Sequence, residues 1–197
     1  MSVEIDTLSK IKLTALKLFN ERGYFETTTR DIASEVGIKS SSLYFYFKSK
    51  EEIFSTLHRE ARALFEKKTY SCLENPLDDD VSNQLYNLFC VSMDFFIENN
   101  EYSKFLFRYF IYEAHGVQQK AGTKLEDWVD IFSSYIIGLF NKGLQNKLFR
   151  KLTPDSLVKT FYRNLNGYIY ELIASNKIPS KDEVNEAWEI YWNGIKA

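Results

Sequence analysis

The chain has 197 residues, of which 45% are hydrophobic, 16% aromatic and 26% charged, with only 8 Gly and 3 Pro. This balance is typical of a globular protein and excludes a disordered or collagen-like chain. The two cysteines, Cys72 and Cys90, are too few for a disulfide framework or a metal cage, so we expect free thiols in a reducing compartment.

No apolar stretch reaches the roughly 18 uncharged residues that a membrane-spanning helix needs. The longest candidate, 128–144, contains Asp130 and Lys142. Residues 1–6 are acidic and lack the apolar run of a secretory signal. We therefore expect a cytoplasmic protein with no membrane partner.

The net charge of -2 is distributed unevenly along the chain. Residues 1–50 contain eight Lys and Arg against six Asp and Glu, whereas the remainder has an excess of acids. Between Val36 and Lys50 there are three lysines and no acidic residue. This asymmetry indicates an N-terminal segment suited to face phosphates.

Turn and capping signals divide the chain into about nine helices, and strand signals are nearly absent, so the predicted fold class is all-α. Thr28 is placed to cap a helix that Gly37 ends, and Ser49 with Glu52 forms a capping-box pattern. The predicted helices cover about 6–22, 29–36, 40–46, 50–68, 81–96, 102–114 and 124–146, followed by two that begin after Thr153 and Ser180.

The segment 29–48, TRDIASEVGIKSSSLYFYFK, has the pattern of a helix-turn-helix. Ala33 is the small residue where two helices touch, Gly37 is the turn, and Ile38 is the apolar residue after it. The outward positions of the second helix then carry short hydroxyl side chains and tyrosines. Short side chains let a helix enter the major groove, and tyrosine and lysine groups reach phosphates.

The longer stretch TTTRDIASEVGIKSSSLYFYFKSKEEIF resembles the N-terminal domain of the TetR family of transcriptional regulators, over about residues 6–58. The resemblance implies a three-helix DNA-binding domain in residues 1–50 and a helical ligand-binding and dimerisation domain in residues 51–197. It implies phosphate contacts from the threonines, tyrosines and Lys50, and base contacts within 39–42. The DNA-binding candidates are Thr28, Thr29, Lys39, Ser40, Ser41, Ser42, Tyr44, Tyr46, Lys48 and Lys50.

Four positions depart from the commonest pattern of that family. Lys39 and Ser40 reverse a frequent Ser-Lys order, Ser41 replaces a frequent glycine, and Phe45 stands where a polar residue is common. Which residue in 39–42 reads bases therefore stays open. The alternative interpretation of the segment is a helical hairpin that docks a protein instead of DNA, and salt dependence of binding separates the two.

From Ser49 onward the chain is rich in large aromatic residues, densest over 95–112. A helix that is apolar almost all round must be buried, either in a packed core or around an apolar cavity. The family resemblance implies an inducer pocket for a small lipophilic or aromatic effector among the middle helices. The pocket candidates are Phe65, Phe89, Phe96, Phe105, Arg108, Tyr109, Tyr112 and Trp128.

The last two predicted helices carry broad apolar faces of the kind that mark association surfaces. The resemblance implies a homodimer through a four-helix bundle, and the alternative is that these faces pack within one chain. The interface candidates are Leu157, Phe161, Leu165, Tyr168, Leu172, Trp188, Tyr191 and Trp192.

No residue pair has metal-ligand spacing, and the sequence contains no glycine-rich phosphate loop or nucleophile elbow. We therefore expect no enzyme, metal or cofactor. The predicted function is a dimeric repressor, released from a palindromic operator in double-stranded DNA by a small molecule. A regulator without a ligand is the nearer alternative, and a helical adaptor protein is the more distant one.

Overall fold

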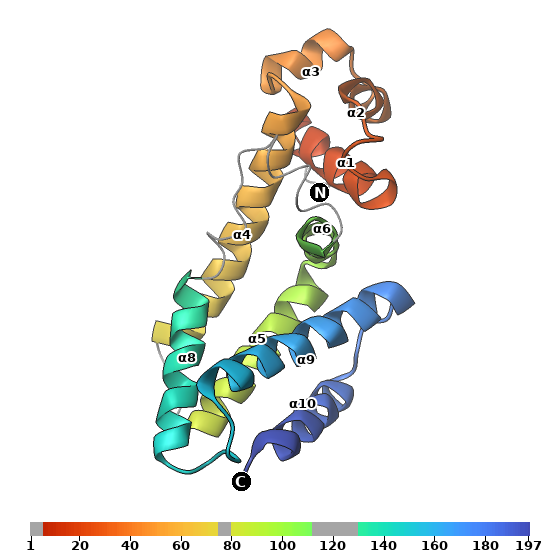
Figure 1. Cartoon of the computed structure of the whole chain (residues 1–197). Coiled ribbons are helices and arrows are strands. Elements are labelled where there is room, and N and C mark those ends of the chain that lie inside the picture. The colour runs from red at the N-terminus through yellow and green to blue at the C-terminus, as the bar shows by residue number, and fades with distance from the viewer. Residues whose placement is uncertain (1–5, 75–79, 112–129) are drawn as a thin grey trace, which may run out of the picture. The chain divides into compact units, whose positions relative to one another are not determined.

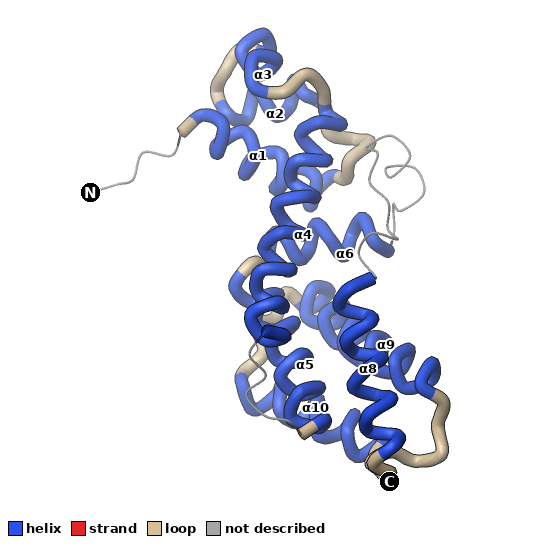
Figure 2. Tube along the Cα trace, turned by 90° about the vertical axis from the view of Figure 1, so that its left-hand side faces the viewer, coloured by secondary structure: helices blue, strands red, loops and turns tan. Residues whose placement is uncertain are grey.

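The computed structural model describes residues 6–74, 80–111 and 130–197, and these residues form nine helices joined by turns (Figure 1, Figure 2). Within these ranges the β-type pairing consists of an isolated bridge between Phe149 and Lys196, which confirms the all-α class. The helices are α1 (Thr7–Arg22), α2 (Thr29–Val36), α3 (Ser40–Tyr46), α4 (Lys50–Glu74), α5 (Val81–Glu98), α6 (Asn100–Ile111), α8 (Asp130–Gln145), α9 (Pro154–Ser175) and α10 (Lys181–Ile195).

Local capping groups explain where the first two helices begin. The carboxylate of Asp6 accepts a hydrogen bond from the Ser9 amide at 3.0 Å, which satisfies a free donor at the start of α1. At α2, Thr28 Oγ1 accepts from the Asp31 amide at 3.2 Å, while Asp31 Oδ2 accepts from the Thr28 amide at 2.8 Å. This reciprocal capping box fixes the start of α2 where the sequence predicts it.

The turn between α2 and α3 depends on a glycine in the left-handed region. Gly37 has φ 78° and ψ 30°, a conformation that costs a residue with a Cβ about 1 kcal/mol or more. The amides of Gly37 and Ile38 donate to the carbonyls of Ser34 and Ala33, at 3.1 and 2.9 Å. These two bonds form a Schellman motif that ends α2 and turns the chain into α3.

The chain divides into two compact units, and α4 runs from the first into the second. Unit 1 comprises Met1–Leu64 and Asn99–Leu125, and unit 2 comprises Phe65–Glu98 and Glu126–Ala197. Unit 1 therefore includes α6 as well as α1, α2 and α3. The sequence-based division after residue 50 instead assigned the segment of α6 to the second domain.

In unit 1, an aromatic cluster joins α1, α4 and α6. Phe54 lies edge-on to Phe19 and Tyr109, with ring centroids 5.9 and 4.8 Å apart, and Phe105 lies 5.0 Å from Phe54. All four side chains are buried. Because such rings each bury a large apolar area, this cluster anchors α6 to α1 and α4.

Polar bonds complete the docking of α6 on α1. The Tyr109 hydroxyl donates to the Phe19 carbonyl at 3.1 Å, and Arg108 Nη1 donates to the Asn20 carbonyl at 3.0 Å. The side-chain amide of Asn20 donates through Nδ2 to the backbone carbonyl of Glu101 at 2.9 Å. The Phe19 carbonyl also accepts from the Gly23 amide at 3.1 Å, whereas Arg108 of α6 supplies a capping donor to the Asn20 carbonyl in the last turn of α1.

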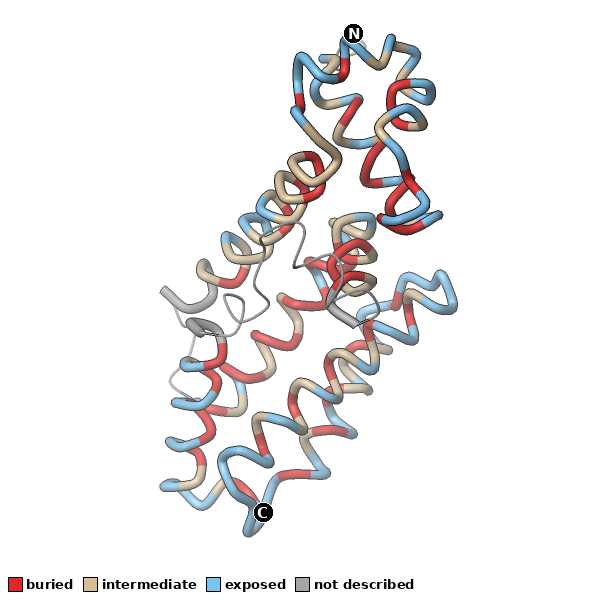
Figure 3. Tube along the Cα trace, turned by 45° about the horizontal axis from the view of Figure 1, so that its top comes forward, coloured by how far each residue is buried: buried red, intermediate tan, exposed pale blue. Residues whose placement is uncertain are grey.

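Unit 2 is built from α5, α8, α9 and α10, whose buried positions recur along one side of each helix (Figure 3). Trp188 on α10 packs against Phe89 on α5, with ring centroids 5.7 Å apart. Phe161 on α9 lies 6.3 Å from Phe140 on α8 and 6.0 Å from Tyr191 on α10. The apolar faces of these four helices thus form one core.

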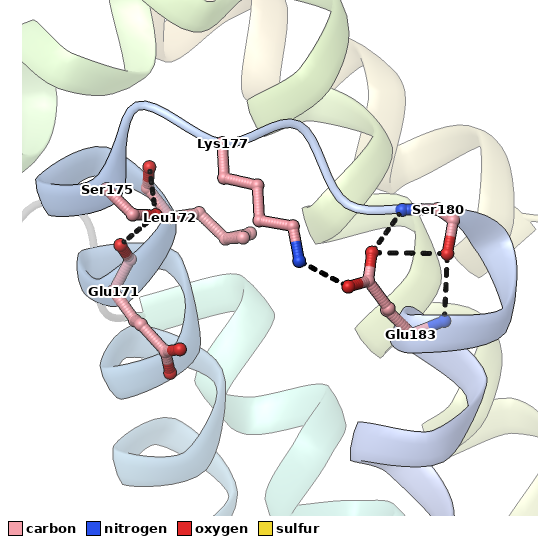
Figure 4. Close-up of polar contacts among 6 residues, drawn as sticks. All are labelled: Glu171, Leu172, Ser175, Lys177, Ser180 and Glu183. Atoms are coloured by element: carbon pink, nitrogen blue, oxygen red, sulfur yellow. Dashed lines mark hydrogen bonds and ion pairs between the residues drawn. The ribbon is translucent and has the colours of Figure 1, made fainter.

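A polar cluster organises the connection between α9 and α10 (Figure 4). Asn176 ends α9 with φ 51°, and Ser180 caps α10. Glu183 accepts hydrogen bonds from the Ser180 amide at 2.8 Å and from the ammonium of Lys177. The bond to Lys177 and the capping bonds lower the pKa of Glu183 to about 2.

Across the described ranges, no helix has both the length and the apolar composition required to cross a membrane.

Candidate nucleic-acid interface

Helix α3 packs against the rest of unit 1 through one side, and the rest of its surface is exposed. Leu43 is fully buried and Phe47, which follows the helix, is buried as well. The candidates Ser41, Ser42, Tyr44 and Tyr46 are exposed, and Ser40 is half-buried. The structure therefore brings the predicted hydroxyl groups together on the open face of α3, which is the second helix of the helix-turn-helix.

The hydroxyl groups of α3 meet the N-terminal end of α2. Tyr44 Oη and Thr29 Oγ1 lie 3.2 Å apart, and Thr28 is the capping residue next to Thr29. The Asp31 carboxylate is occupied by the Thr28 hydroxyl and amide, and these bonds lower its pKa. The Thr28 hydroxyl already donates to Asp31, and within the Thr29–Tyr44 pair one hydroxyl donates to the other, so one hydroxyl of this pair is left to donate to a phosphate.

Lys50 has a structural task that the sequence did not reveal. Its ammonium donates to the carbonyl oxygens of Tyr24 and Thr27, both at 2.7 Å, and lies 4.2 Å from the centroid of the Tyr24 ring. The Tyr24 hydroxyl in turn donates to Glu51 at 2.9 Å. Lys50 thereby secures the loop between α1 and α2, and its predicted phosphate contact stays a prediction.

The other basic candidates extend from the same surface. Lys39 precedes α3 and Lys48 follows it, and both side chains are exposed. The amide of Lys48 donates to Glu52 Oε2 at 2.6 Å, and the Glu52 amide donates to Ser49 Oγ at 3.2 Å. The predicted capping box is therefore formed on its serine side, while the carboxylate of Glu52 caps the preceding residue.

Two exposed residues beside these candidates are absent from the sequence-based set. Arg30 is exposed in the first turn of α2, and Phe45 is 87% exposed in α3. A signal for Phe45 existed in the sequence, because the position lies two residues after the buried Leu43 and therefore on the opposite side of a helix.

The pocket candidates are divided between the two units. Phe105, Arg108 and Tyr109 belong to unit 1, where they pack on α1 and α4 or cap α1. The sequence placed these three residues in the second domain, whereas α6 lies in unit 1 against α1 and α4; their contact with a ligand stays a prediction. Phe89 and Phe96 are buried in unit 2. Phe65, also in unit 2, is half-buried and contacts Phe95, with ring centroids 5.2 Å apart. Tyr112 and Trp128 lie outside the described residues.

Most interface candidates are covered by their own chain. Because their accessible surface is already removed, they have almost none to give to a second copy. Six candidates are buried within the chain, as the alternative of packing inside one copy predicts: Leu157, Phe161, Leu165, Leu172, Trp188 and Tyr191. Tyr168 and Trp192 are half-buried, and nearby the exposed apolar residues Tyr170 and Ile190 point away from the core.

The fold and the open face of α3 thus define a helix-turn-helix protein with a second helical unit. Residues 13–57 match the family model described as "Bacterial regulatory proteins, tetR family". A curated relative from Staphylococcus epidermidis, "Biofilm operon icaADBC HTH-type negative transcriptional regulator IcaR", is 49% identical over 45 residues, which are 23% of this chain and 24% of that protein. The matched segment therefore spans about a quarter of the relative's length.

Solved structures resemble the chain over nearly its whole length. The ketosteroid transcriptional regulator KstR2 of Mycobacterium tuberculosis has a TM-score of 0.77 at 21% identity, covering 100% of this chain and 97% of that one. AibR, solved in complex with isovaleryl coenzyme A and operator DNA, has a TM-score of 0.72 at 16% identity, with coverage of 96% and 97%. At these identities the likeness establishes the fold. Separately, the N-terminal match shows that residues 13–57 are similar to the DNA-binding segment of the TetR family of regulators.

Proposed function

We propose that the protein is a DNA-binding transcriptional regulator that recognises its operator through α3 and the N-terminal end of α2. The observation that carries this proposal is the open face of α3. Leu43 is buried on one side of this helix, and the exposed sides carry hydroxyl groups, with exposed lysines before and after the helix. Short polar side chains suit entry into the major groove, and flanking cations suit the phosphates on both sides. We favour repression over activation, because the relative IcaR is named as a negative regulator.

We further propose that two copies act together on a palindromic operator. Two-fold symmetry in a helix-turn-helix protein matches two half-sites about one helical turn apart or a multiple of it. The exposed apolar side chains of α9 and α10, Tyr170 and Ile190, support an association surface on the outside of unit 2. Sedimentation of wild type and Ile190→Glu tests this, and a dimer that is unaffected by the substitution would place the contact elsewhere.

The effector is a small apolar molecule that binds unit 2 in this proposal. Support comes from the aromatic residues of its core, including Phe89, Phe96 and Trp188, and from the acyl coenzyme A named in the AibR complex. Thermal-shift screening with acyl thioesters and flat aromatics tests the proposal, because a ligand that binds only the folded protein raises its melting temperature. The ligand-independent regulator predicts no shift with any of them.

Two helices provide routes by which such a ligand would act on DNA binding. Helix α4 begins after the helix-turn-helix and continues into unit 2, and α6 follows α5 directly and caps α1. A ligand that binds better to one arrangement of α4 or α6 shifts the population of DNA-competent molecules by its differential affinity, and by no more.

Selection from random duplex DNA with the purified full chain tests the central proposal. We expect enrichment of a palindrome whose half-sites lie on one side of the duplex. If folded protein enriches no sequence even at low salt, the surface of α3 does not read DNA, and the protein-docking alternative replaces this proposal.

A further inference from the structure

The most exposed part of α3 is an aromatic hydrocarbon. Phe45 is 87% exposed, more than the other large hydrophobic residues of the described chain, among which Ile190 is 68% exposed. Single apolar residues on a surface are ordinary, so exposure by itself carries no function. The position within the helix-turn-helix is what gives Phe45 its meaning.

Helical geometry places Phe45 at the centre of the open face. At about 100° per residue, the side chains of Ser41 and Phe45 both point away from the buried Leu43. Ser41 and Phe45 are also i and i+4 neighbours, so they lie one above the other. The ring of Phe45 rests against the ring of Tyr46, with centroids 5.5 Å apart and planes at 85°. Its direction is therefore supported by a neighbour.

The chemistry of Phe45 limits what it contacts in DNA. Its side chain has no hydrogen-bond donor or acceptor, so it contributes nothing to phosphate binding. The edges of the bases in the major groove are polar except for the C5 methyl group of thymine. A phenyl ring on the outermost part of α3 matches that methyl group, and the exposed Lys39 and Lys48 on either side of the helix match the flanking phosphates.

We infer that Phe45 is a specificity-determining residue that reads a thymine methyl group in each half-site of the operator. This inference rests on the proposed DNA-binding function and deepens it. Ser41, directly beside Phe45, is short enough to let the ring approach the base edges. The operator therefore contains a thymine at a fixed position in each half, and adenine, guanine or cytosine there lacks the methyl group that the ring contacts.

The test uses the palindrome enriched by selection, with thymines replaced one at a time by uracil. Uracil lacks only the C5 methyl group, so base pairing and the polar edges are unchanged. We expect replacement of the contacted thymine in one half-site to weaken wild-type binding about fourfold, the factor that one buried methyl group of about 0.8 kcal/mol provides. The same replacement has no effect on Phe45→Ala, which already binds the unmodified operator more weakly.

Matched variants separate this role from a general effect on the fold. Phe25→Ala removes another exposed phenylalanine of unit 1, outside α3, and should keep the fourfold sensitivity to uracil. Phe45→Leu retains an apolar side chain and should recover part of the sensitivity. Melting temperatures of all variants check that the domain stays folded.

The outcomes are distinct for the two proposals. If the wild type binds its operator but loses equal affinity with uracil whether or not Phe45 is present, the inference about Phe45 is wrong and the DNA-binding function stands. If Phe45→Ala binds the operator as tightly as wild type, Phe45 does not face the bases. If no duplex is bound in a salt-dependent manner, the proposed function itself fails.

Discussion

Tyr44 is held in position by another side chain before any DNA is bound. Its hydroxyl lies 3.2 Å from that of Thr29, and the Tyr44 side chain is 53% exposed. A phenol fixed in this way loses little conformational freedom when it donates to a phosphate, so its contribution to affinity should be large for a single neutral group.

We predict that Tyr44→Phe weakens operator binding about tenfold, since hydrogen bonds to charged groups contribute about 1.5 kcal/mol or more. The fold should be unaffected, because the removed hydroxyl is at the surface. Fluorescence anisotropy measures the affinity, and the melting temperature of the variant checks that the domain stays folded. An unchanged affinity would remove Tyr44 from the interface.

Glu183 couples the connection between α9 and α10 to pH. Its pKa is lowered from 4.5 to about 2 by the bond to Lys177 and by the cap at Ser180. Between these two values the unfolded chain binds the proton and the folded chain does not, so stability rises with pH in this range. The contribution is fully present above about pH 4.5 and is lost as the pH falls toward 2.

Glu183→Gln tests this dependence, because glutamine keeps the capping-box acceptor and removes the charge. The variant should unfold at lower urea concentration than wild type at pH 7, and the difference should shrink as the pH is lowered below 4.5. The effect is small because the pair is exposed and screened by salt. Glu186→Gln, on the same helix and outside the cap, is the control; a difference that does not vary with pH would contradict the assigned cause.

Helix α8 contains two glycines at which substitution by alanine is predicted to have opposite effects on stability. A Cβ on Gly143 would lie 2.2 Å from Cε2 of Phe149, whose ring is packed against Phe140 and Trp192. A Cβ on Gly138 meets no other described atom within 4 Å. One position thus tolerates a side chain and the other does not.

We predict that Gly143→Ala lowers the free energy of unfolding by about 1 to 3 kcal/mol through overpacking. Gly138→Ala should raise it by up to about 1 kcal/mol, because alanine is the better helix former. Thermal unfolding of both variants measures this contrast. Equal effects of the two substitutions would mean that the Phe149 ring moves aside freely.

The ends of α2 and α3 could be predicted from sequence because their signals are local. Thr28 with Asp31 and the left-handed Gly37 specify the boundaries through bonds within a few residues, and the structure has the predicted ranges 29–36 and 40–46. The helix α3 itself is rich in Ser, Tyr and Phe, which are moderate helix formers, so its conformation depends on the burial of Leu43.

The partner of α6 could not be predicted in the same way. Its apolar residues, Phe105, Leu106 and Tyr109, indicate burial but carry no information about which helix covers them. The bond from Arg108 to the Asn20 carbonyl joins residues 88 positions apart, and no local pattern encodes such a contact. For the same reason the sequence left open whether the apolar faces of α9 and α10 pack within one chain or between copies, and six of the eight candidates are buried in unit 2.

In the molecule as a whole, DNA binding depends on where the charges lie as well as on the shape of the helix-turn-helix. Despite a net charge of -2, the chain presents Arg30, Lys39 and Lys48 as exposed cations on or beside the helix-turn-helix. A dimer brings about six such cations to the duplex, and each phosphate contact releases a counterion. Binding should therefore be strongly dependent on salt even though the protein is acidic overall.

The most direct test is the affinity of the full chain for its selected palindrome, measured between about 50 and 200 mM salt. With about six phosphate contacts, we expect the affinity to fall about a thousandfold over this range, with one dimer bound per palindrome. Affinity that is independent of salt, or equal binding to unrelated duplexes of the same length, would contradict the assignment of α3 as an operator-reading helix.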